Sequence, residues 1–205
     1  NKDGGDDIPF LLNHAQIGLT KDFERQRLHG ELHSILIILL KCRQWGGSTD
    51  TEVYMFWIQM FWKTNWNSNI IGHQSSSATQ VFDMYEKLAN AIPTWLYYEI
   101  GETFKEDSRK LRTSSTQNNI KYLIPRSCKI QTGSARNPES CRSADAAMAH
   151  ITEEAFFPNT TEWTPQKVVN AAISPINVTR PYTFIVREST PNGREDEFHD
   201  EWVRA

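Results

Sequence analysis

The chain of 205 residues has few cysteines and no long hydrophobic run. Its three cysteines, Cys42, Cys128 and Cys141, are too few and too scattered for a disulfide framework or a zinc site, and they favour a reducing compartment. The longest purely aliphatic run, Ile35 to Leu40, is far shorter than a membrane-spanning helix. These absences exclude a disulfide-rich secreted domain and an integral membrane protein.

The chain also has no excess of positive charge. Lys and Arg number 22 against 25 Asp and Glu, a formal net charge of −3, so strong binding of nucleic acid by charge alone is not expected. Hydrophobic residues make up 39% and charged residues 23%, which excludes a disordered chain and indicates one domain with a real core. The chain begins at Asn1 without an initiator Met or a signal peptide, as a fragment or a processed chain would.

Short apolar runs alternate with segments of helical periodicity. The predicted strands are 35–40, 69–74, 128–132, 146–152 and 183–188, and the predicted helices are 53–62, 78–92, one starting at Thr164-Pro165, and 198–205. Thr49 with Glu52, and Ser77 with Gln80, match capping boxes for the first two helices. This alternation predicts an α/β fold with a mostly parallel sheet and helices on both faces, in which ligands bind at the carboxyl ends of the strands.

The first predicted strand is followed by a glycine-containing loop, Lys41-Cys42-Arg43-Gln44-Trp45-Gly46-Gly47-Ser48-Thr49. A phosphate loop needs glycines so that backbone N–H groups can surround oxygens, a cation for the phosphates and a hydroxyl for magnesium. Gly46 and Ser48 occupy the second-glycine and hydroxyl positions of G-x-x-x-x-G-K-[ST], but Gly47 stands at the lysine position. Taken alone, the segment equally fits an ordinary strand–turn–helix connection.

Two later strands also end in polar residues. Residues 149–156 form a hydrophobic strand that ends in Glu153-Glu154, where a P-loop ATPase needs a carboxylate to orient the attacking water. Residues 184–193 place hydroxyls and an amide after another buried strand, as expected for a sensor of the γ-phosphate. Each has a simpler interpretation, a solvated turn for the glutamates and a β-turn for Pro-Asn-Gly.

Together and in this order, these segments resemble the large terminase subunits of tailed bacteriophages. Residues 40–49 resemble their deviant Walker A segment, 150–156 their Walker B and catalytic-glutamate segment, and 188–193 their coupling motif. Residues 12–16 resemble their adenine-reading segment, and 70–74 followed by a helix also fits. The resemblance implies a P-loop NTPase of the additional-strand, RecA-like class.

The resemblance implies a role for individual residues. The nucleotide-binding set that it implies is Gln16, which would read the adenine, and Lys41, Arg43, Gln44, Gly46, Gly47, Ser48 and Thr49. Either Lys41 or Arg43 would replace the missing lysine at the phosphates. Ser48 and Glu153 would hold Mg²⁺. The coupling residues would be Ser189, Thr190 and Asn192.

The catalytic carboxylate has two possible registers. Many relatives carry Asp-Glu at the end of the acidic strand, whereas this chain offers Thr152-Glu153 or Glu153-Glu154. We favour Glu153 as catalytic because Ala155-Phe156 then matches the family's Ala-Phe pair, with Glu154 as the alternative. Arg142 stands where the family places an arginine that reaches into the neighbouring subunit.

The resemblance implies the ATPase domain of a DNA-packaging motor that uses ATP and Mg²⁺. Residues 1–34 would form an N-terminal lid or adenine-binding segment and 35–205 the ATPase core, with no nuclease domain and no nuclease activity. Implied partners are double-stranded DNA, a portal protein, a small terminase subunit and further copies in a ring, in the bacterial host cytoplasm at the procapsid portal vertex, with no membrane. There are two alternatives. One is another P-loop translocase such as a helicase, and the other is a non-catalytic docking module, which the Gly47 substitution suggests.

Overall fold

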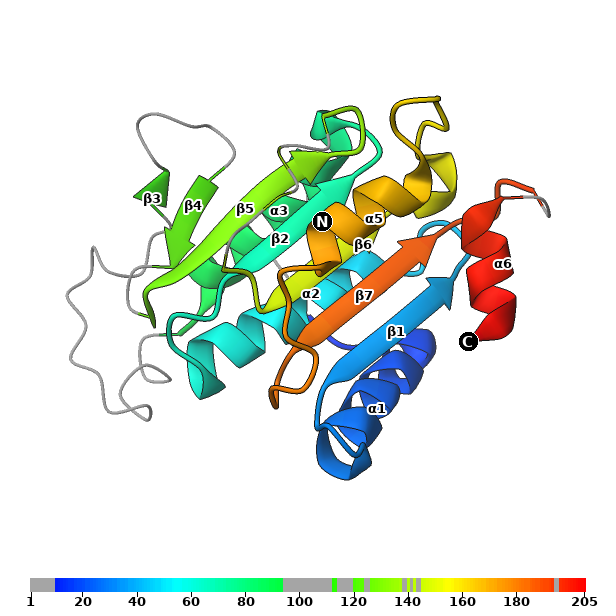
Figure 1. Ribbon diagram of the computed structural model, residues 1–205. Helices are drawn as coiled ribbons and strands as arrows, with labels where there is room; N and C mark the ends of the chain where they lie inside the picture. Colours follow the sequence, from blue (N-terminus) through cyan, green and yellow to red (C-terminus); the bar gives the residue numbers. More distant parts are fainter. Residues whose placement is uncertain are drawn as a thin grey trace.

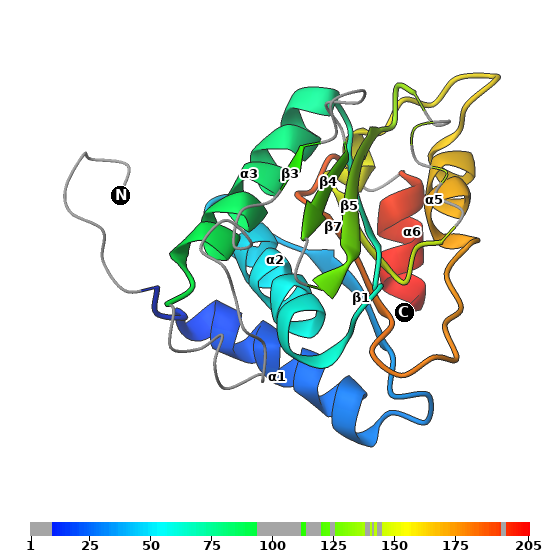
Figure 2. The ribbon, with the colours of Figure 1, turned by 90° about the vertical axis from the view of Figure 1, so that its left-hand side faces the viewer.

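The computed structural model describes residues 10–93, 112–113, 120–123, 126–137, 140, 142, 145–193 and 196–205. In the described part of the chain, one sheet lies between two layers of helices (Figures 1 and 2). The strands are β1 (Ile35–Leu40), β2 (Ser68–Gly72), β3 (Arg112–Thr113), β4 (Ile120–Leu123), β5 (Cys128–Ser134), β6 (Met148–Thr152) and β7 (Phe184–Ser189). Their order in the sheet is β1-β7-β6-β2-β5-β4-β3.

The sheet is mostly parallel, as predicted. β1, β7, β6, β2 and β5 pair in parallel, whereas β4 and β3 add antiparallel strands at one edge. β7 lies between β1 and β6, so the strand before the glycine loop and the strand before the glutamates are separated by one strand. The five parallel strands end at the same edge of the sheet, which brings their following residues together.

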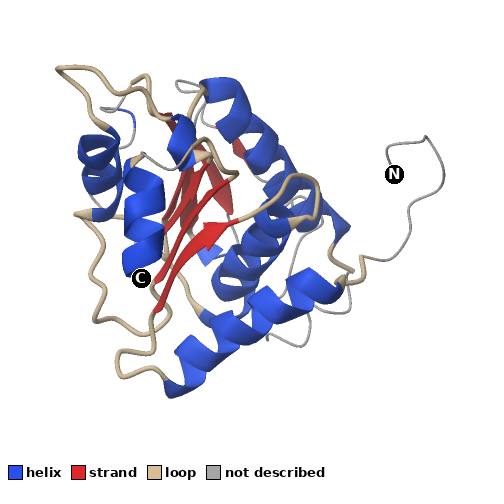
Figure 3. Cartoon of the chain, turned by 90° about the vertical axis from the view of Figure 1, so that its right-hand side faces the viewer, coloured by secondary structure: helices blue, strands red, loops and turns tan. Residues whose placement is uncertain are grey.

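Helices cover both faces of the sheet (Figure 3). The helices are α1 (His14–His29), α2 (Gly47–Trp57), which continues as a π-helical turn (Ile58–Trp62), α3 (Ser75–Ala91), α5 (Pro165–Ile173) and α6 (Glu197–Arg204). α1, α2 and α3 pack on one face, and α5 and α6 on the other (Figure 2). The larger part of the core lies under the first three helices, where Tyr54 stacks on Phe184 and Phe23 packs against both rings.

Both predicted capping boxes are wrong. α2 begins at Gly47, six residues before the predicted start, and its N-cap is Gly46, which makes no side-chain cap. Glu52 is buried and contacts His150 on β6, so burial against the sheet decided its position. α3 begins at Ser75 after Gln74, again without a side-chain cap. Pro93 does follow the end of α3 closely, and Thr164 does cap α5, as predicted.

α1, β3 and β4 were not predicted. α1 buries only Gln16, Leu19 and Phe23, so most of its sequence is polar and its apolar stripe is too sparse to identify by periodicity. Its start carries the capping box that the other helices lack, formed by Asn13 and Gln16. None of the helices in the described part of the chain combines the length and apolarity of a membrane span.

Candidate nucleotide site

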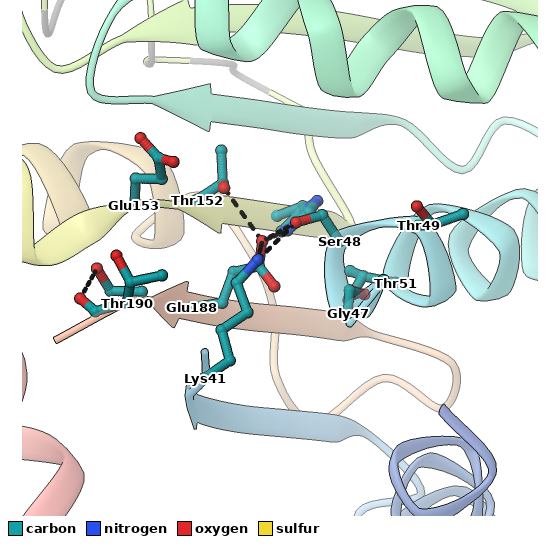
Figure 4. A network of polar contacts seen from close by, with 12 residues as sticks. Lys41, Gly47, Ser48, Thr49, Thr51, Thr152, Glu153, Glu188 and Thr190 are labelled. Atoms are coloured by element: carbon teal, nitrogen blue, oxygen red, sulfur yellow. Dashed lines mark hydrogen bonds and ion pairs between the residues drawn. The ribbon is translucent and has the colours of Figure 1, made fainter. Parts of the chain in front are cut away.

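Several of the predicted site residues lie where β1, β6 and β7 end beside the first turn of α2 (Figure 4). Pairing in the sheet sets Leu40 opposite Ser189 and Thr152 opposite Glu188. Lys41 therefore leaves β1 beside the last residues of β7, and Ser48 on α2 lies over them. This is the edge at which the sequence predicted ligand binding.

The loop between β1 and α2 has a backbone that only certain residues adopt easily. Gln44 and Gly46 have φ values of 67° and 86°, in the left-handed region. A Cβ atom at Gly46 would lie 2.6 Å from Nε2 of Gln16, and one at Gly47 would lie 2.6 Å from the Trp45 ring. A lysine at position 47 would therefore displace Trp45. The first N–H groups of any helix have no partner within that helix, and the N-cap Gly46 offers no side chain to α2, so this helix start is a favourable position for an anion.

Lys41 is the cation that points into the site. Its Nζ lies 2.8 Å from Oγ of Ser48 and 3.0 Å from Oε1 of Glu188. Arg43, the other candidate, is exposed on the loop. The structure thus brings together Lys41 and Ser48, two of the residues predicted to bind phosphate and magnesium.

Glu188 is at the centre of this cluster; the resemblance included it as the first residue of the coupling motif but implied no role for it. It is fully buried, and its Oε1 accepts hydrogen bonds from Ser48 (2.5 Å) and Thr152 (3.1 Å). Its Oε2 is buried without a hydrogen-bond partner in the structure. The signal for it was present, because a glutamate inside an apolar strand is seldom buried unless it is paired.

Buried charges on both sides stabilise the Glu188 carboxylate. Burial alone would raise its pKa, but the nearby charges of His150 and Lys41 and the Ser48 hydrogen bond lower the pKa to about 2. His150 lies with Nε2 3.2 Å from Glu188 and Nδ1 2.5 Å from Glu52, all three fully buried. Burial would lower the pKa of His150, but these two carboxylates raise it to about 9. The site is thus built on a buried network that joins α2, β6 and β7.

Glu153 and Glu154 are neighbours with opposite environments. Glu153 has a left-handed backbone with φ 57°, its side chain is 41% exposed, and its Oε2 lies 2.8 Å from Nδ1 of His73. Glu154 is buried and forms an ion pair with Arg187, which also pairs with Glu201 on α6. Burial raises the pKa of Glu154, whereas the bonds from Arg187 oppose that rise. Arg187 on β7 thus joins Glu154 and the helix α6.

Figure 4 shows the Glu153 side chain pointing away from the Lys41–Ser48–Glu188 cluster. The structure therefore brings Ser48, one of the two predicted magnesium ligands, together with Glu188 rather than with Glu153.

The end of β7 and the residues that follow it form hydrogen bonds with the 3₁₀ turn Glu154–Phe156. Ser189 Oγ accepts a hydrogen bond from the backbone N–H of Ala155 (3.1 Å) and donates one to the Thr190 carbonyl (2.9 Å). Asn192 Nδ2 donates to the Ala155 carbonyl (2.9 Å). Two of the three predicted coupling residues, Ser189 and Asn192, are therefore bonded to the backbone of Ala155, and Thr190 is linked to that turn through Ser189.

No model of a known protein family matches the sequence, and no curated protein matches it either. Solved structures do match the fold. The large terminase of the thermophilic bacteriophage D6E has a TM-score of 0.63 at 13% identity, covering 95% of this chain and 43% of that one. The large terminase of bacteriophage HK97 has a TM-score of 0.66 at 14% identity, covering 97% and 38%.

A mutant of the large terminase ATPase domain of Thermus phage P74-26 has a TM-score of 0.55 at 17% identity, covering 93% of this chain and 69% of that one. The chain has the fold of the large terminase ATPase domain. The predicted P-loop, additional-strand fold class is thereby confirmed, with β7 as the strand inserted between β1 and β6. The chain spans less than half the length of the D6E and HK97 terminases.

Three predicted residues lie elsewhere in this terminase fold. Gln16 is buried beneath the loop, where Nε2 donates to the Gly46 carbonyl (2.9 Å). The Thr49 hydroxyl donates to Met84 Sδ on α3, away from the loop. Arg142 is exposed and lines a surface groove with Trp163 and Lys167 beside α5, rather than joining the Lys41–Ser48–Glu188 cluster.

Proposed function

We propose that this chain is the ATPase domain of a viral DNA-packaging terminase, which hydrolyses ATP to move double-stranded DNA into a procapsid. The observation that carries the proposal is the convergence of Lys41, Ser48 and the Glu153 strand end at one edge of a terminase-type sheet. A cation, a hydroxyl, a helix N-terminus and a carboxylate are the groups that phosphoryl transfer to water requires.

The residues present fit ATP with Mg²⁺. The described residues contain no cluster of three or more His, Cys, Asp or Glu that could hold a metal ion by themselves. Mg²⁺ does not need one, because it is commonly held by one or two protein oxygens together with the phosphates of the nucleotide. The Ser48 hydroxyl and the unpartnered buried oxygen of Glu188 supply such oxygens. When bound, the ion would neutralise charge on the β- and γ-phosphates.

Two other groups complete the proposed chemistry. Lys41 binds the phosphates in place of a lysine at position 47, because its Nζ already reaches the Ser48 hydroxyl from the end of β1. Glu153 takes the proton of the attacking water, because its carboxylate is exposed at the strand end whereas that of Glu154 is committed to Arg187. The hydrogen bonds of Ser189 and Asn192 to Ala155 give the coupling segment a direct path to Glu153.

The assembly follows from the same proposal. Copies of the chain form a ring at the portal of a procapsid in the bacterial host, together with the small terminase subunit, and Arg142 of one copy completes the site of its neighbour. The assignment of residues 1–34 as lid and of the nuclease chemistry to a separate domain belongs to the same proposal.

A non-catalytic docking module is the second candidate. The Trp45 ring beside Gly47 favours it, because it leaves no room for the usual lysine. The two candidates differ in nucleotide binding, which only the motor requires.

The test is binding of a fluorescent, non-hydrolysable ATP analogue with Mg²⁺. A charge-assisted hydrogen bond to phosphate is among the stronger ones, so Lys41→Ala should raise Kd by roughly 10- to 100-fold. Arg43→Ala should raise it less, and Lys21→Ala, an exposed lysine on α1, serves as the matched control and should leave Kd unchanged. If the wild-type chain binds no analogue, or if the double variant Lys41→Ala, Arg43→Ala binds as well as wild type, the phosphate-loop assignment is wrong.

A further inference from the structure

The end of β6 lacks an acidic residue at the place where P-loop NTPases need one. In these enzymes Mg²⁺ is held by the hydroxyl of the loop and by an aspartate at the end of the Walker B strand. If Glu153 acts on the water, the residue before it occupies that position, and it is Thr152. A threonine carries no charge and cannot replace a carboxylate, so another residue must supply one.

Glu188 lies beside that position on the neighbouring strand. It pairs with Thr152 across β6 and β7, and its Oε1 lies 3.1 Å from the Thr152 hydroxyl. The same oxygen accepts the Ser48 hydrogen bond at 2.5 Å. The Glu188 carboxylate on β7 therefore reaches both the Ser48 hydroxyl and Thr152, the residue at the end of β6 that replaces the aspartate (Figure 4).

The neighbouring cations keep this carboxylate ionised. One of its two oxygens is left without a hydrogen bond from the described residues. Lys41 and His150 lie 3.0 and 3.2 Å from Oε1, so the buried negative charge is balanced. The other oxygen, Oε2, has no hydrogen-bond partner among the residues that the structure describes, which is costly for a buried carboxylate unless something binds there. Carboxylate and hydroxyl oxygens are the ligands that Mg²⁺ prefers.

We propose that Glu188 supplies the carboxylate that holds Mg²⁺ beside Ser48, replacing an aspartate at the end of β6. The carboxylate for Mg²⁺ would then come from β7, the neighbour of β6 in the sheet, rather than from β6 itself. This inference rests on the proposed function, because the ion enters with the nucleotide. A purely structural Glu188, serving only as counter-ion to Lys41 and His150, is the competing explanation.

The experiment titrates Mg²⁺ into chain mixed with the fluorescent ATP analogue. Removal of a group that orients a metal typically costs 10- to 100-fold in metal affinity, so Glu188→Gln should raise the Mg²⁺ concentration at half-saturation by roughly that factor. In EDTA the same variant should bind the analogue at least as well as wild type, because a carboxylate without its cation repels phosphate. The control is Glu86→Gln. Glu86 pairs with Lys121 on β4, so this variant should change neither the Mg²⁺ concentration at half-saturation nor the binding of the analogue in EDTA.

A carboxylate returned to β6 makes the test sharper. The double variant Thr152→Asp, Glu188→Gln should bring the Mg²⁺ midpoint back to within a few-fold of wild type. The spectrum of bound Mn²⁺, recorded by electron paramagnetic resonance, should change in Glu188→Gln and recover in the double variant. Glu188→Asp, which keeps the charge, guards against a variant that fails to fold.

The possible failures are distinguishable. A wild-type chain that binds no nucleotide overturns the proposed function and this inference with it. Normal nucleotide binding together with an unchanged Mg²⁺ midpoint in Glu188→Gln overturns the inference alone. So does an equal loss of binding in EDTA and in Mg²⁺, or a double variant that stays as weak as Glu188→Gln, since each indicates a structural role.

Discussion

Two consecutive glutamates show how strongly position decides chemistry at the scale of the residue. Glu153 and Glu154 have the same side chain, yet one is exposed beside His73 and the other is buried against Arg187. The left-handed backbone at Glu153 separates them, because it turns the chain out of β6 before the 3₁₀ turn at Glu154–Phe156 begins. A catalytic base must be accessible, and a buried ion pair must not be broken, so we expect opposite phenotypes.

Glu153→Gln should abolish hydrolysis and leave nucleotide affinity near wild type, because the amide keeps the shape but cannot take a proton. Glu154→Gln should keep most of the turnover and lose roughly 1.5–3 kcal/mol of stability, because its charged hydrogen bonds to Arg187 weaken. Phosphate release and urea unfolding measure the two effects. The reverse pattern, an inactive Glu154→Gln and an active Glu153→Gln, would place the catalytic register one residue later.

Cys128 provides a pH-dependent test of burial at the start of β5. Burial raises the pKa of its thiol from 9.0 to about 11, and the thiol accepts the Trp66 N–H. The folded state therefore holds this proton more tightly than the unfolded state, so its contribution to stability is complete below pH 9 and is lost as pH rises toward 11.

Relative to Cys128→Ala, the wild-type chain should lose roughly 2 kcal/mol of unfolding free energy between pH 8 and pH 10.5. Urea unfolding of both proteins at the two pH values measures this, and the difference cancels groups that titrate in both. Parallel losses in the two proteins would show that the Cys128 thiol is not protected by the fold. The exposed Cys42 is best changed to Ser in both to avoid oxidation.

At the scale of the element, α1 and the loop between β1 and α2 form one unit. Asn13 caps α1 by accepting from the Gln16 N–H, and its Nδ2 donates to the Trp45 carbonyl in the loop (2.8 Å). Gln16 Nε2 also donates a hydrogen bond to the Gly46 carbonyl of the same loop. The start of α1 thus holds the loop in place through two side chains.

Asn13→Ala should remove both functions of this residue. It should cost about 1 kcal/mol of stability through the lost cap, and it should weaken nucleotide binding because the Trp45 carbonyl loses its donor. Asn13→Asp is the matched control, since its oxygen still caps the helix but it has no N–H for Trp45. We expect Asn13→Asp to retain stability while binding the analogue as weakly as Asn13→Ala, measured by thermal unfolding and fluorescence. Equal binding in both variants and wild type would show that the loop does not depend on α1.

At the scale of the whole molecule, the predicted arginine Arg142 and the Lys41–Ser48–Glu188 cluster lie at separate places. Arg142 lines a surface groove beside α5 with Trp163 and Lys167, away from the cluster at the strand ends of its own chain. An arginine that acts on catalysis from there must act on another copy. Arginines supplied by a partner contribute roughly 10³–10⁵ in rate in other P-loop enzymes.

Hydrolysis by the isolated chain should therefore be very slow at dilution and rise with protein concentration. Arg142→Ala should be inactive by itself and should recover activity when mixed with Glu153→Gln, because a site with its glutamate intact then borrows an arginine. Arg136→Ala, an exposed arginine near β5, is the control and should behave as wild type. Absence of recovery, with assembly confirmed by light scattering, would contradict a role for Arg142 in the neighbouring site.

The sequence by itself determined the parallel part of the sheet and the edge at which the predicted site residues follow its strands. The branched aliphatic run at 35–40 and the apolar residues Phe184-Ile185-Val186 within 183–188 favour buried strands, and α/β alternation sends their polar followers to one edge. Lys41, Ser48 and the acidic pair were found in this way. A sparse apolar stripe hid α1, and the Gly46 N-cap displaced the predicted start of α2, because burial outweighs local capping signals.

Only the tertiary structure decided which residues act together. The inserted strand β7 brings Glu188 beside Thr152 and Ser48, which lie far from it in the sequence, and no spacing rule predicts that contact. Arg187 on β7 likewise removes Glu154 from the cluster by pairing with it, and the same guanidinium pairs with Glu201 on α6. Local pattern sets where a strand ends, but the order of strands in the sheet sets which charges meet, and that order comes from long-range packing.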